Sequence, residues 1–388
     1  MDDFKAIVIG AGLSGAVMAE RIACVLGWKV LVLEQRSHIA GNCFDQKNDQ
    51  GITVHQYGPH LFHTSRPEVW EYLSRFTDWH PYQHKVLAEV AGKLIPLPFN
   101  LNSLHLVYPA EQAIALEAKL VALYGAGNKV SITKLRETED PELAQLADWI
   151  YNNIFVNYTM RQWGIKAEEI APEVLARVPV VLSRDDRYFH DNYQAIPAAG
   201  YTALISRLLS HQNINVQLLQ NALQRIKLEQ GQIWLDGELF NGKLIYTGML
   251  DQLFAYQFGE LPYRSLKFLF RQLDCPYFQT ATTVNYPNAP DFTRITEFKH
   301  ILAEPSDSTT IVTEYPQDYD KNDPQRNIPY YPVFTGDNQQ RFEKYKALSA
   351  QYPQLTPLGR LAEYKYFNMD DAVANALQSF TELQKNCV

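Results

Sequence analysis

Cysteine is scarce in this chain of 388 residues, and long apolar runs are absent from it. The four cysteines, Cys24, Cys43, Cys275 and Cys387, form no CxxC pair and do not have the spacing of metal ligands. We therefore expect reduced thiols in a cytoplasmic protein, without a disulfide or a metal site. No charged segment precedes a short apolar one at the N-terminus, and no apolar run reaches about 18 residues, so we expect neither export nor a membrane span.

Basic residues are also in deficit. Lys and Arg total 35 against 43 Asp and Glu, which gives a formal net charge of −8, and no long basic run occurs. This balance argues against nucleic acid and against an anionic membrane surface as partners. An acidic protein that binds an anionic substrate has to gather its arginines locally, so paired arginines are informative. Tyrosine is abundant, with 23 residues, and its stacking face and hydroxyl suit a nucleotide or sugar site.

The N-terminal segment has the pattern of a dinucleotide site. Ala6 to Ile9 is a continuous apolar run, which is typical of a parallel strand buried on both faces. A helical pattern and a second apolar run, Val30 to Leu33, come next, and this second run ends on Glu34. Between the first strand and the helix stand Gly10, Ala11, Gly12, Leu13, Ser14 and Gly15. The glycines let backbone amides approach a pyrophosphate, the helix N-terminus favours its charge, and the acid can accept from ribose hydroxyls, which predicts a Rossmann-like domain.

The residues after Glu34 favour FAD over NAD. A basic residue and then small residues ending in Gly-Asn are similar to the continuation in FAD enzymes of the glutathione-reductase-like class, whereas an NAD domain usually begins another crossover unit. The residues concerned are Gln35, Arg36, Gly41 and Asn42. We also expect His60, which follows a Gly-Pro break, to lie near the flavin.

The remaining patterns predict two further domains. Residues 86–98 predict a hairpin, residues 109–176 have a helical pattern, and strand-like segments that alternate polar and apolar residues recur over 214–334. We therefore predict an α/β protein with a Rossmann-like FAD-binding domain, a helical insertion domain and an antiparallel β-sheet substrate domain. The expected boundaries are 1–81 plus 201–250 plus 335–388 for the FAD-binding domain, 97–176 for the helical domain with a mobile loop, and 82–96 plus 177–200 plus 251–334 for the substrate domain.

Six further segments resemble the UDP-galactopyranose mutase family, in order along nearly the whole chain. They are YTMRQWG (158–164), ARVPV (176–180), RYFHDNYQAIPAAGYTALI (187–205), FTRITEFKH (292–300), IPYYPV (328–333) and GRLAEYKYFNM (359–369). The resemblance implies an isomerase that interconverts UDP-galactopyranose and UDP-galactofuranose, with FAD that is active when reduced and no net redox change. It further implies that flavin N5 attacks the anomeric carbon and displaces UDP, which leaves a flavin–sugar iminium adduct. An external reductant, a homodimer and a product used in cell-surface glycans are expected as well.

The same resemblance implies roles for particular residues. The departing diphosphate needs planar, permanently charged groups, and arginine supplies them. The catalytic set is Arg177 and Arg294, with the hydroxyl donors Tyr331 and Tyr366, and His60. The substrate set adds the nucleotide-side and sugar-side residues Phe155, Tyr158, Thr159, Trp163, Tyr188, Asn285, Asn368 and His84. Gly359, Arg360 and Met369 join the N-terminal residues in the cofactor set.

The C-terminal segment is expected to serve cofactor and substrate together. A helix that begins at Met369 would direct its N-terminal amides at the reduced flavin, whose negative charge they stabilise. Tyr366 would project into the sugar-phosphate site from a strand just before this helix. The glycine break at 125–127 and the segment 166–180 correspond to family loops that close over the substrate.

Two departures from the usual bacterial pattern leave the hexose open. His84 stands where Asn is common, and Asn368 replaces an acid, both in the zone expected to border the sugar. A mutase acting on TDP-fucose, UDP-N-acetylgalactosamine or another nucleotide sugar is the alternative. An amine-oxidase-like FAD oxidoreductase would explain the glycine motif but not the arginines and aromatic residues. A third alternative is a nucleotide-sugar binder without catalysis, although the intact flavin motifs argue against it.

Overall fold

The computed structural model describes residues 4–164 and 179–386 and has a parallel sheet as its first structural unit. Its strands, in spatial order, are β12 (Ile214–Gln217), β2 (Val30–Leu33), β1 (Ala6–Ile9), β16 (Lys243–Tyr246) and β22 (Leu355–Pro357). Successive residues of a strand point to opposite faces, and the two faces of this sheet carry separate hydrophobic clusters. The continuous apolar runs of β1 and β2 are therefore explained by burial on both sides.

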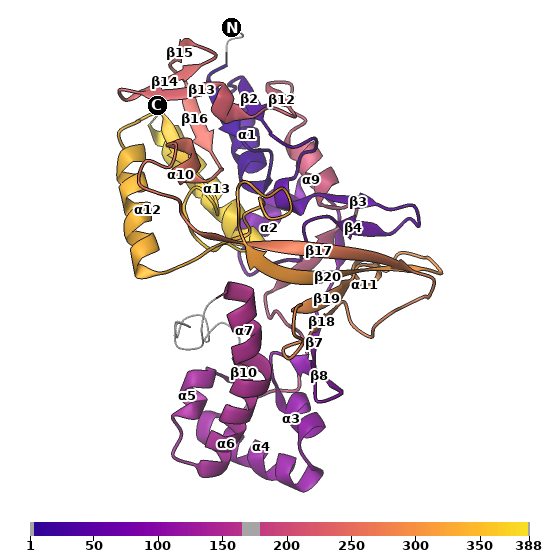
Figure 1. Ribbon diagram of the computed structural model, residues 1–388. Coiled ribbons are helices and arrows are strands. Elements are labelled where there is room, and N and C mark those ends of the chain that lie inside the picture. Colours follow the sequence, from indigo (N-terminus) through magenta and orange to yellow (C-terminus); the bar gives the residue numbers. More distant parts are fainter. Residues whose placement is uncertain (1–3, 165–178, 387–388) are drawn as a thin grey trace.

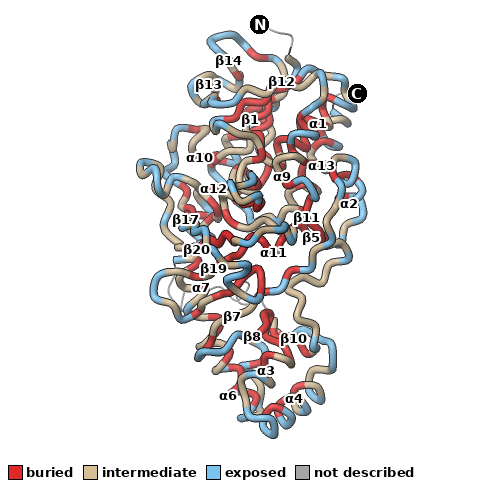
Figure 2. Tube along the Cα trace, turned by 90° about the vertical axis from the view of Figure 1, so that its right-hand side faces the viewer, coloured by how far each residue is buried: buried red, intermediate tan, exposed pale blue. Residues whose placement is uncertain are grey.

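Helices cover both faces of the parallel sheet (Figure 1). On one face the residues Ala6 and Val8 pack with three helices: α1 (Leu13–Val25), α9 (Tyr201–Leu208) and α13 (Met369–Lys385). On the other face Ile7 packs with α10 (Leu250–Leu253), α12 (Gly336–Ser349) and a small antiparallel sheet of β13 (Ile226–Glu229), β14 (Gln232–Leu235) and β15 (Glu238–Phe240). Figure 2 shows the buried residues concentrated around β1 and α1.

A second, seven-stranded sheet crosses the middle of the molecule (Figure 1). Its order is β21 (Tyr331–Pro332), β17 (Tyr263–Leu273), β20 (Thr309–Asp318), β19 (Arg294–Glu297), β18 (Thr283–Asn285), β7 (Val86–Val90) and β8 (Lys93–Leu97). All neighbouring pairs are antiparallel except β18 with β7, which are parallel, so the sheet predicted to be antiparallel is mixed. The predicted hairpin at 86–98 is confirmed as β7 and β8.

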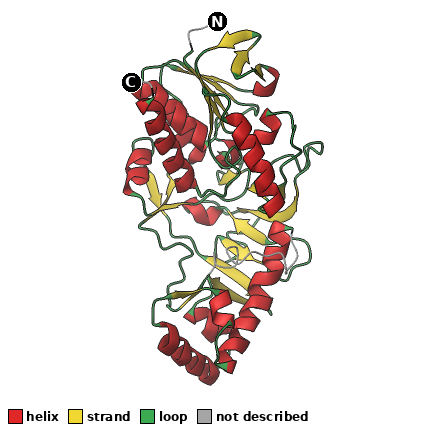
Figure 3. Ribbon diagram, turned by 90° about the vertical axis from the view of Figure 1, so that its left-hand side faces the viewer, coloured by secondary structure: helices red, strands yellow, loops and turns green. Residues whose placement is uncertain are grey.

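The part of the molecule beyond this sheet is almost wholly helical (Figure 3). It contains α3 (Leu101–Val107), α4 (Ala110–Tyr124), α5 (Ile132–Arg136), α6 (Pro141–Ile150), a π-helical turn at Tyr151–Phe155 and α7 (Val156–Trp163). Side chains cap several of these helices: Asn100 accepts from the Ser103 amide at 3.0 Å, and Asp140 accepts from the Glu142 amide at 2.9 Å. A short ribbon of β9 (Lys129–Val130) and β10 (Val180–Val181) joins this part.

Short elements link the two larger sheets. One small sheet contains β5 (Phe62–Thr64), β11 (Tyr193–Pro197) and β6 (Trp79–Pro81), and another contains β3 (Asp45–Lys47) and β4 (Thr53–His55). The helices among them are α2 (Pro67–Ser74) and α11 (Lys299–Leu302).

The predicted fold class is confirmed, with one local correction. The chain has a Rossmann-like parallel sheet, a helical part and a largely antiparallel sheet, and α13 begins at Met369 as predicted. Tyr366, expected on a strand, instead follows a series of turns over 360–364 that includes Tyr364 at φ +48°. The domain boundaries stay a prediction. Within the described ranges, no helix is both long enough and apolar enough to cross a membrane.

Candidate active site

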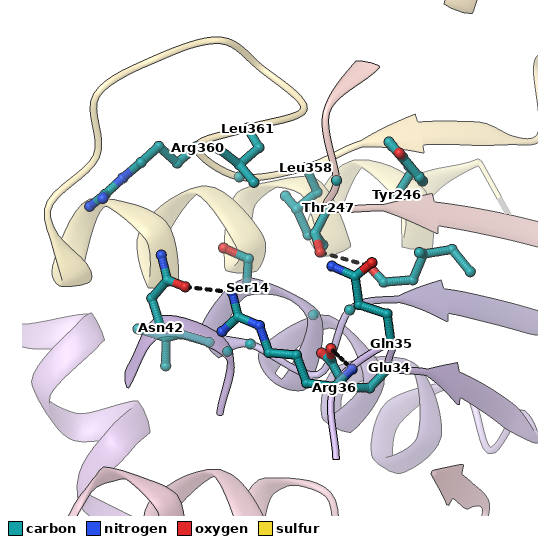
Figure 4. Close-up of a pocket in the computed structure, with 18 of the residues that line it drawn as sticks. Ser14, Glu34, Gln35, Arg36, Asn42, Tyr246, Thr247, Leu358, Arg360 and Leu361 are labelled. Carbon is teal, nitrogen blue, oxygen red and sulfur yellow. Dashed lines mark hydrogen bonds between the residues drawn. The ribbon is translucent and has the colours of Figure 1, made fainter. Parts of the chain in front are cut away.

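A cavity of about 250 Å³ lies beside the glycine turn that joins β1 to α1 (Figure 4). It is lined by segments far apart in the sequence, which the parallel sheet brings together at the carboxyl ends of its strands. Every residue predicted for the cofactor lines it: Gly10, Gly12, Leu13, Ser14, Gly15, Glu34, Gln35, Arg36, Gly41, Asn42, His60, Gly359, Arg360 and Met369.

The turn at the start of this cavity requires glycine at two positions. Gly10 has φ +98°, and a Cβ atom there would lie 2.2 Å from Oγ1 of Thr247. A Cβ atom on Gly15 would lie 2.1 Å from the carbonyl oxygen of Gly10. The clash at Gly15 is against backbone, and the positive φ of Gly10 is one that L side chains rarely adopt, so the sequence Gly-x-Gly-x-x-Gly maintains the close approach of turn and helix.

Two charged side chains are fixed at the edge of the same cavity. The buried carboxylate of Glu34 accepts from the amides of Ala11 and Arg36, each at 2.9 Å, and both oxygens keep lone pairs for further donors. The Arg36 guanidinium lies 4.4 Å from the ring centroid of Tyr57, and its Nη2 donates to Asn42 at 2.9 Å. Its Nη1 is buried and has no hydrogen-bond partner in the described chain. This orphaned donor fits an anionic group in the cavity, as the pyrophosphate of a dinucleotide would be.

A second cavity, of about 240 Å³, lies between the seven-stranded sheet, helix α7 and the loop that follows β4. Eight residues predicted for the substrate line it: Tyr158, Tyr188, Asn285, Arg294, Tyr331, Tyr366, Asn368 and His84. The sheet register explains part of this grouping, since Arg294 is paired directly with Asn285 on β18 and with Glu314 on β20. Directly paired residues have their side chains on the same face of a sheet.

Arg294 lines the second cavity and forms an ion pair with a buried glutamate. Its Nε lies 2.7 Å from Oε1 of Glu314, whose side chain is 0 % exposed, while the arginine side chain is 24 % exposed. Burial alone would lower the pKa of Arg294, but Glu314 and the nearby Tyr158 raise this pKa well above its ordinary value. The guanidinium therefore stays charged, and its exposed part faces the cavity.

The tyrosine hydroxyl groups beside Arg294 keep their protons at neutral pH and can therefore donate hydrogen bonds. Burial raises the pKa of Tyr331 to about 12, although Arg294 opposes this shift, and burial raises that of Tyr158 to about 12 as well. The rings of Tyr331 and Tyr366 are stacked with centroids 6.0 Å apart. Arg360 lies 5.7 and 5.4 Å from these two centroids, and it donates to the carbonyl oxygens of Tyr330 and Phe367.

The two cavities meet at a shared boundary. His60, Arg360, Asn368 and Met369 line both of them. Asn368 and Met369 form the N-terminus of α13, and the acids that follow are turned onto Arg66: one Asp371 oxygen lies 2.8 Å from its Nη1. Asp371 also accepts from the Asn368 amide at 3.2 Å in a capping box, so this amide is already paired within the first turn of α13. A dinucleotide in the first cavity and a ligand in the second would contact one another here.

Comparison with known proteins agrees with this geometry. Residues 153–366 match the UDP-galactopyranose mutase family, and residues 8–76 match an NAD(P)-binding Rossmann-like domain. UDP-galactopyranose mutase of Mycoplasma pneumoniae is 32% identical over 385 residues, which cover 98% of this chain and 96% of that protein. The chain belongs to the UDP-galactopyranose mutase family.

Two further proteins are similar to this chain. dTDP-fucopyranose mutase of Escherichia coli is also 32% identical, over 377 residues that cover 96% of this chain and 97% of that protein. A crystal structure of reduced UDP-galactopyranose mutase superposes with a TM-score of 0.69 at 17% identity, covering 99% of this chain and 94% of that one. The chain is thus as similar to a mutase named for a dTDP sugar as to one named for a UDP sugar.

Membership in the UDP-galactopyranose mutase family establishes the enzyme class and the cofactor. The chain is an isomerase that uses FAD in the reduced state. The first cavity fits FAD, because its glycine turn, the fixed carboxylate of Glu34 and the orphaned Nη1 of Arg36 match the needs of ribose and pyrophosphate.

The structure places the remaining predicted residues away from the second cavity or outside the described chain. Phe155 packs in the core of the helical part and Thr159 is buried; neither lines the second cavity. Trp163 does not line it either, but its ring centroid lies 5.9 Å from that of Tyr331. Arg177 lies outside the described residues.

The loops predicted to close over the substrate are only partly described. Residues 166–178 of the second loop lie outside the described ranges. In the first loop, at 125–127, the amide of Gly127 donates to the carbonyl oxygen of Leu182 at 2.7 Å, so this glycine turn is hydrogen-bonded to the segment that follows β10.

Several residues that line the cavities were missed by sequence reasoning. Glu314 is the most consequential, and the signal was present: it is an acid within the otherwise apolar and threonine-rich strand TTIVTEYP. His63 also lines the second cavity, where its Nδ1 lies 2.8 Å from Oδ2 of Asp191 and its ring stacks on Phe189. Thr247 lines the first cavity, and no motif marked it.

Proposed function

We propose that this enzyme interconverts UDP-galactopyranose and UDP-galactofuranose, with reduced FAD and without net redox change. The observation that carries the proposal is the charged Arg294 in a cavity that adjoins the FAD cavity along a shared boundary. A nucleotide sugar held by its diphosphate at Arg294 would extend its sugar toward His60 and Met369, where the flavin would lie.

The roles of the protein groups follow from their chemistry. Arg294, with Arg177, holds the diphosphate as it departs, and the hydroxyls of Tyr331 and Tyr366 donate to its oxygens. Such contacts strengthen as charge develops on the leaving group, so they lower the barrier rather than only the dissociation constant. Tyr158 and Tyr188, which line the second cavity, stack at the nucleotide side. Phe155, Thr159 and Trp163 do not line that cavity, and their place at the nucleotide stays a prediction.

Bound and reduced, the flavin would supply the nucleophile, its N5 atom, for the anomeric carbon that UDP leaves. The N-terminus of α13 lies at the boundary of the two cavities, since Asn368 and Met369 line both, and the positive end of its helix dipole would stabilise negative charge on the flavin. His60 is neutral, since burial lowers its pKa to about 3, and it donates or accepts without adding charge beside the flavin.

A product assay tests the proposal. UDP-galactofuranose is added to the holoenzyme, once oxidised and once reduced by dithionite, and the nucleotide sugars are separated by chromatography. Conversion to UDP-galactopyranose by the reduced form alone is expected. Stoichiometric reoxidation of the flavin by the sugar, or tight binding without conversion, would contradict the proposal. Cyanoborohydride added during turnover should attach the hexose to the flavin, which mass spectrometry of the released cofactor would reveal.

A second candidate substrate is TDP-fucose. It is favoured by the 32% identity to dTDP-fucopyranose mutase and by His84 and Asn368, which depart from the usual pattern of the family and line the second cavity. UDP-N-acetylgalactosamine is a third candidate. A panel of these nucleotide sugars in the same assay ranks the three by kcat/KM.

The proposal also covers the cellular setting. An external reductant maintains the flavin, the enzyme works in the cytoplasm as a homodimer, and the furanose product enters cell-surface glycans. Anaerobic reduction by NADH or NADPH and light scattering of the purified protein test the reductant and the dimer.

A further inference from the structure

His84 is a buried, polar side chain of the second cavity, at a position expected to border the sugar where Asn is common in the family. It is 5 % exposed, it lies immediately before β7, and its ring is 5.8 Å from Tyr188 and 5.9 Å from Phe189. Its Nδ1 lies 3.0 Å from the hydroxyl oxygen of Tyr82. No hydrogen bond joins its other ring nitrogen, Nε2, to any residue of the described chain.

The contacts of Tyr82 determine which nitrogen of His84 carries the proton. The Tyr82 hydroxyl donates to Oγ1 of Thr282 at 2.6 Å. A tyrosine has one proton to donate, so this hydroxyl can act toward His84 only as an acceptor. Nδ1 of His84 must therefore be the donor, and in a neutral imidazole this leaves Nε2 without a hydrogen.

The imidazole is neutral throughout the physiological pH range. Burial lowers the pKa of His84 to about 3, and the nearby charges of Arg294 and His63 act in the same direction. Tyr82 keeps its proton as well, because burial raises its pKa far above neutrality. The chain Thr282–Tyr82–His84 thus holds one tautomer, with Nε2 as a pure acceptor in the cavity.

We propose that His84 selects nucleotide sugars that present a hydrogen-bond donor, a hydroxyl or an amide N–H, to its Nε2, and that Tyr82 and Thr282 impose this selection by fixing the tautomer. This proposal rests on the proposed function, because it assumes that the ligand of the second cavity is a nucleotide sugar. An asparagine at this position could donate or accept, whereas the fixed imidazole can only accept. A sugar with a carboxylate, a carbonyl or no polar group at that point would leave Nε2 unpaired.

The tautomer is tested on the oxidised holoenzyme without any sugar. Nitrogen-15 NMR of histidine-labelled protein separates protonated from bare ring nitrogens, and His84→Gln assigns the signal. We expect Nδ1–H with bare Nε2 in the wild type, and population of Nε2–H in Tyr82→Phe. Tyr345→Phe is the matched control, since it removes another buried hydroxyl, which donates to Gly259 at 2.8 Å, and should leave the His84 signals unchanged. An Nε2–H form in the wild type overturns the proposal.

Selection is tested by dissociation constants for UDP-galactose and its 2-, 3-, 4- and 6-deoxy analogues. One analogue should bind the wild type about 10–100-fold more weakly than the parent sugar, because it leaves a buried acceptor unpaired. In His84→Phe the same analogue and the parent should bind within about threefold of one another. Equal ratios in both proteins overturn the selection by His84. If no nucleotide sugar binds, the proposed function fails, and the NMR result alone decides the tautomer.

Discussion

Replacing Glu314 by glutamine removes the charge that faces Arg294 and keeps the shape of the side chain. At the observed separation of 2.7 Å, the attraction between two unit charges is about 6 kcal/mol for an effective dielectric constant of about 20. Breaking a buried pair typically costs about 3–5 kcal/mol of stability, because the remaining charge stays unpaired. We therefore expect Glu314→Gln to unfold at a clearly lower urea concentration than the wild type.

The same substitution, Glu314→Gln, should raise the affinity for UDP although it lowers stability. Arg294 without its carboxylate has more of its charge available for a diphosphate, so UDP should bind Glu314→Gln at least about tenfold more tightly, equivalent to about 1.4 kcal/mol. Isothermal titration calorimetry on the oxidised holoenzyme measures this. Bound UDP should also recover much of the lost stability.

Glu297→Gln is the matched control for this experiment. Glu297 is equally buried on the neighbouring strand, but it accepts from the amides of Phe278 and Gln279, each at 2.9 Å, and lines neither cavity. It should lose stability and keep the wild-type affinity for UDP. If Glu314→Gln bound UDP within about twofold of the wild type, the placement of the diphosphate at Arg294 would be refuted.

Three further predictions concern the same sites. Arg294→Lys keeps the charge but loses the planar guanidinium, so turnover should fall about 10²–10³-fold. Arg207→Lys, at the surface, is the control and should leave turnover unchanged. Steady-state kinetics measures both variants, and a mild loss of turnover in Arg294→Lys would contradict the leaving-group role. Gly10→Ala should abolish FAD retention, whereas Gly51→Ala, at φ +75° with open space around it, should retain flavin absorbance. The pKa of His55 is lowered by burial to about 4, so the unfolded chain binds its proton first. This one group should lower stability by up to about 1.4 kcal/mol per pH unit as the pH drops from about 6.5 to 4, in addition to the contributions of His60 and His84. His55→Gln should reduce the slope by that amount in urea titrations.

Local sequence patterns sufficed for the cofactor domain. The strands Ala6–Ile9 and Val30–Leu33 match their apolar runs to the residue, because burial on both faces excludes polar residues and the flanking glycine and acid mark the ends. Helix α13 begins at the predicted Met369. Residues of the motif at 10–15 are neighbours in any fold, whereas His60, Gly359, Arg360 and Met369 reach the same cavity only through the fold and were assigned from the Gly-Pro break and the family resemblance.

The contacts in the second cavity were harder to predict from the sequence, because the register between strands determines which residues meet there. The contact of Arg294 with Glu314 depends on the alignment of β19 with β20, which no local pattern reveals. The chain Thr282–Tyr82–His84 joins residues 200 positions apart and was missed for the same reason. Phe155 was assigned to the substrate by resemblance; it lies at the end of the π-helical turn and packs in the helical core, and its role at the substrate stays a prediction.

The shared boundary of the two cavities has a thermodynamic consequence. Since His60, Arg360, Asn368 and Met369 line both cavities, a flavin in the first supplies part of the wall of the second. The affinities for cofactor and nucleotide sugar are then linked, and linkage is reciprocal: whatever factor FAD adds to sugar binding, the sugar adds to retention of FAD. Apoprotein should therefore be a poor binder of nucleotide sugars, and assembly should be ordered, with the flavin entering first.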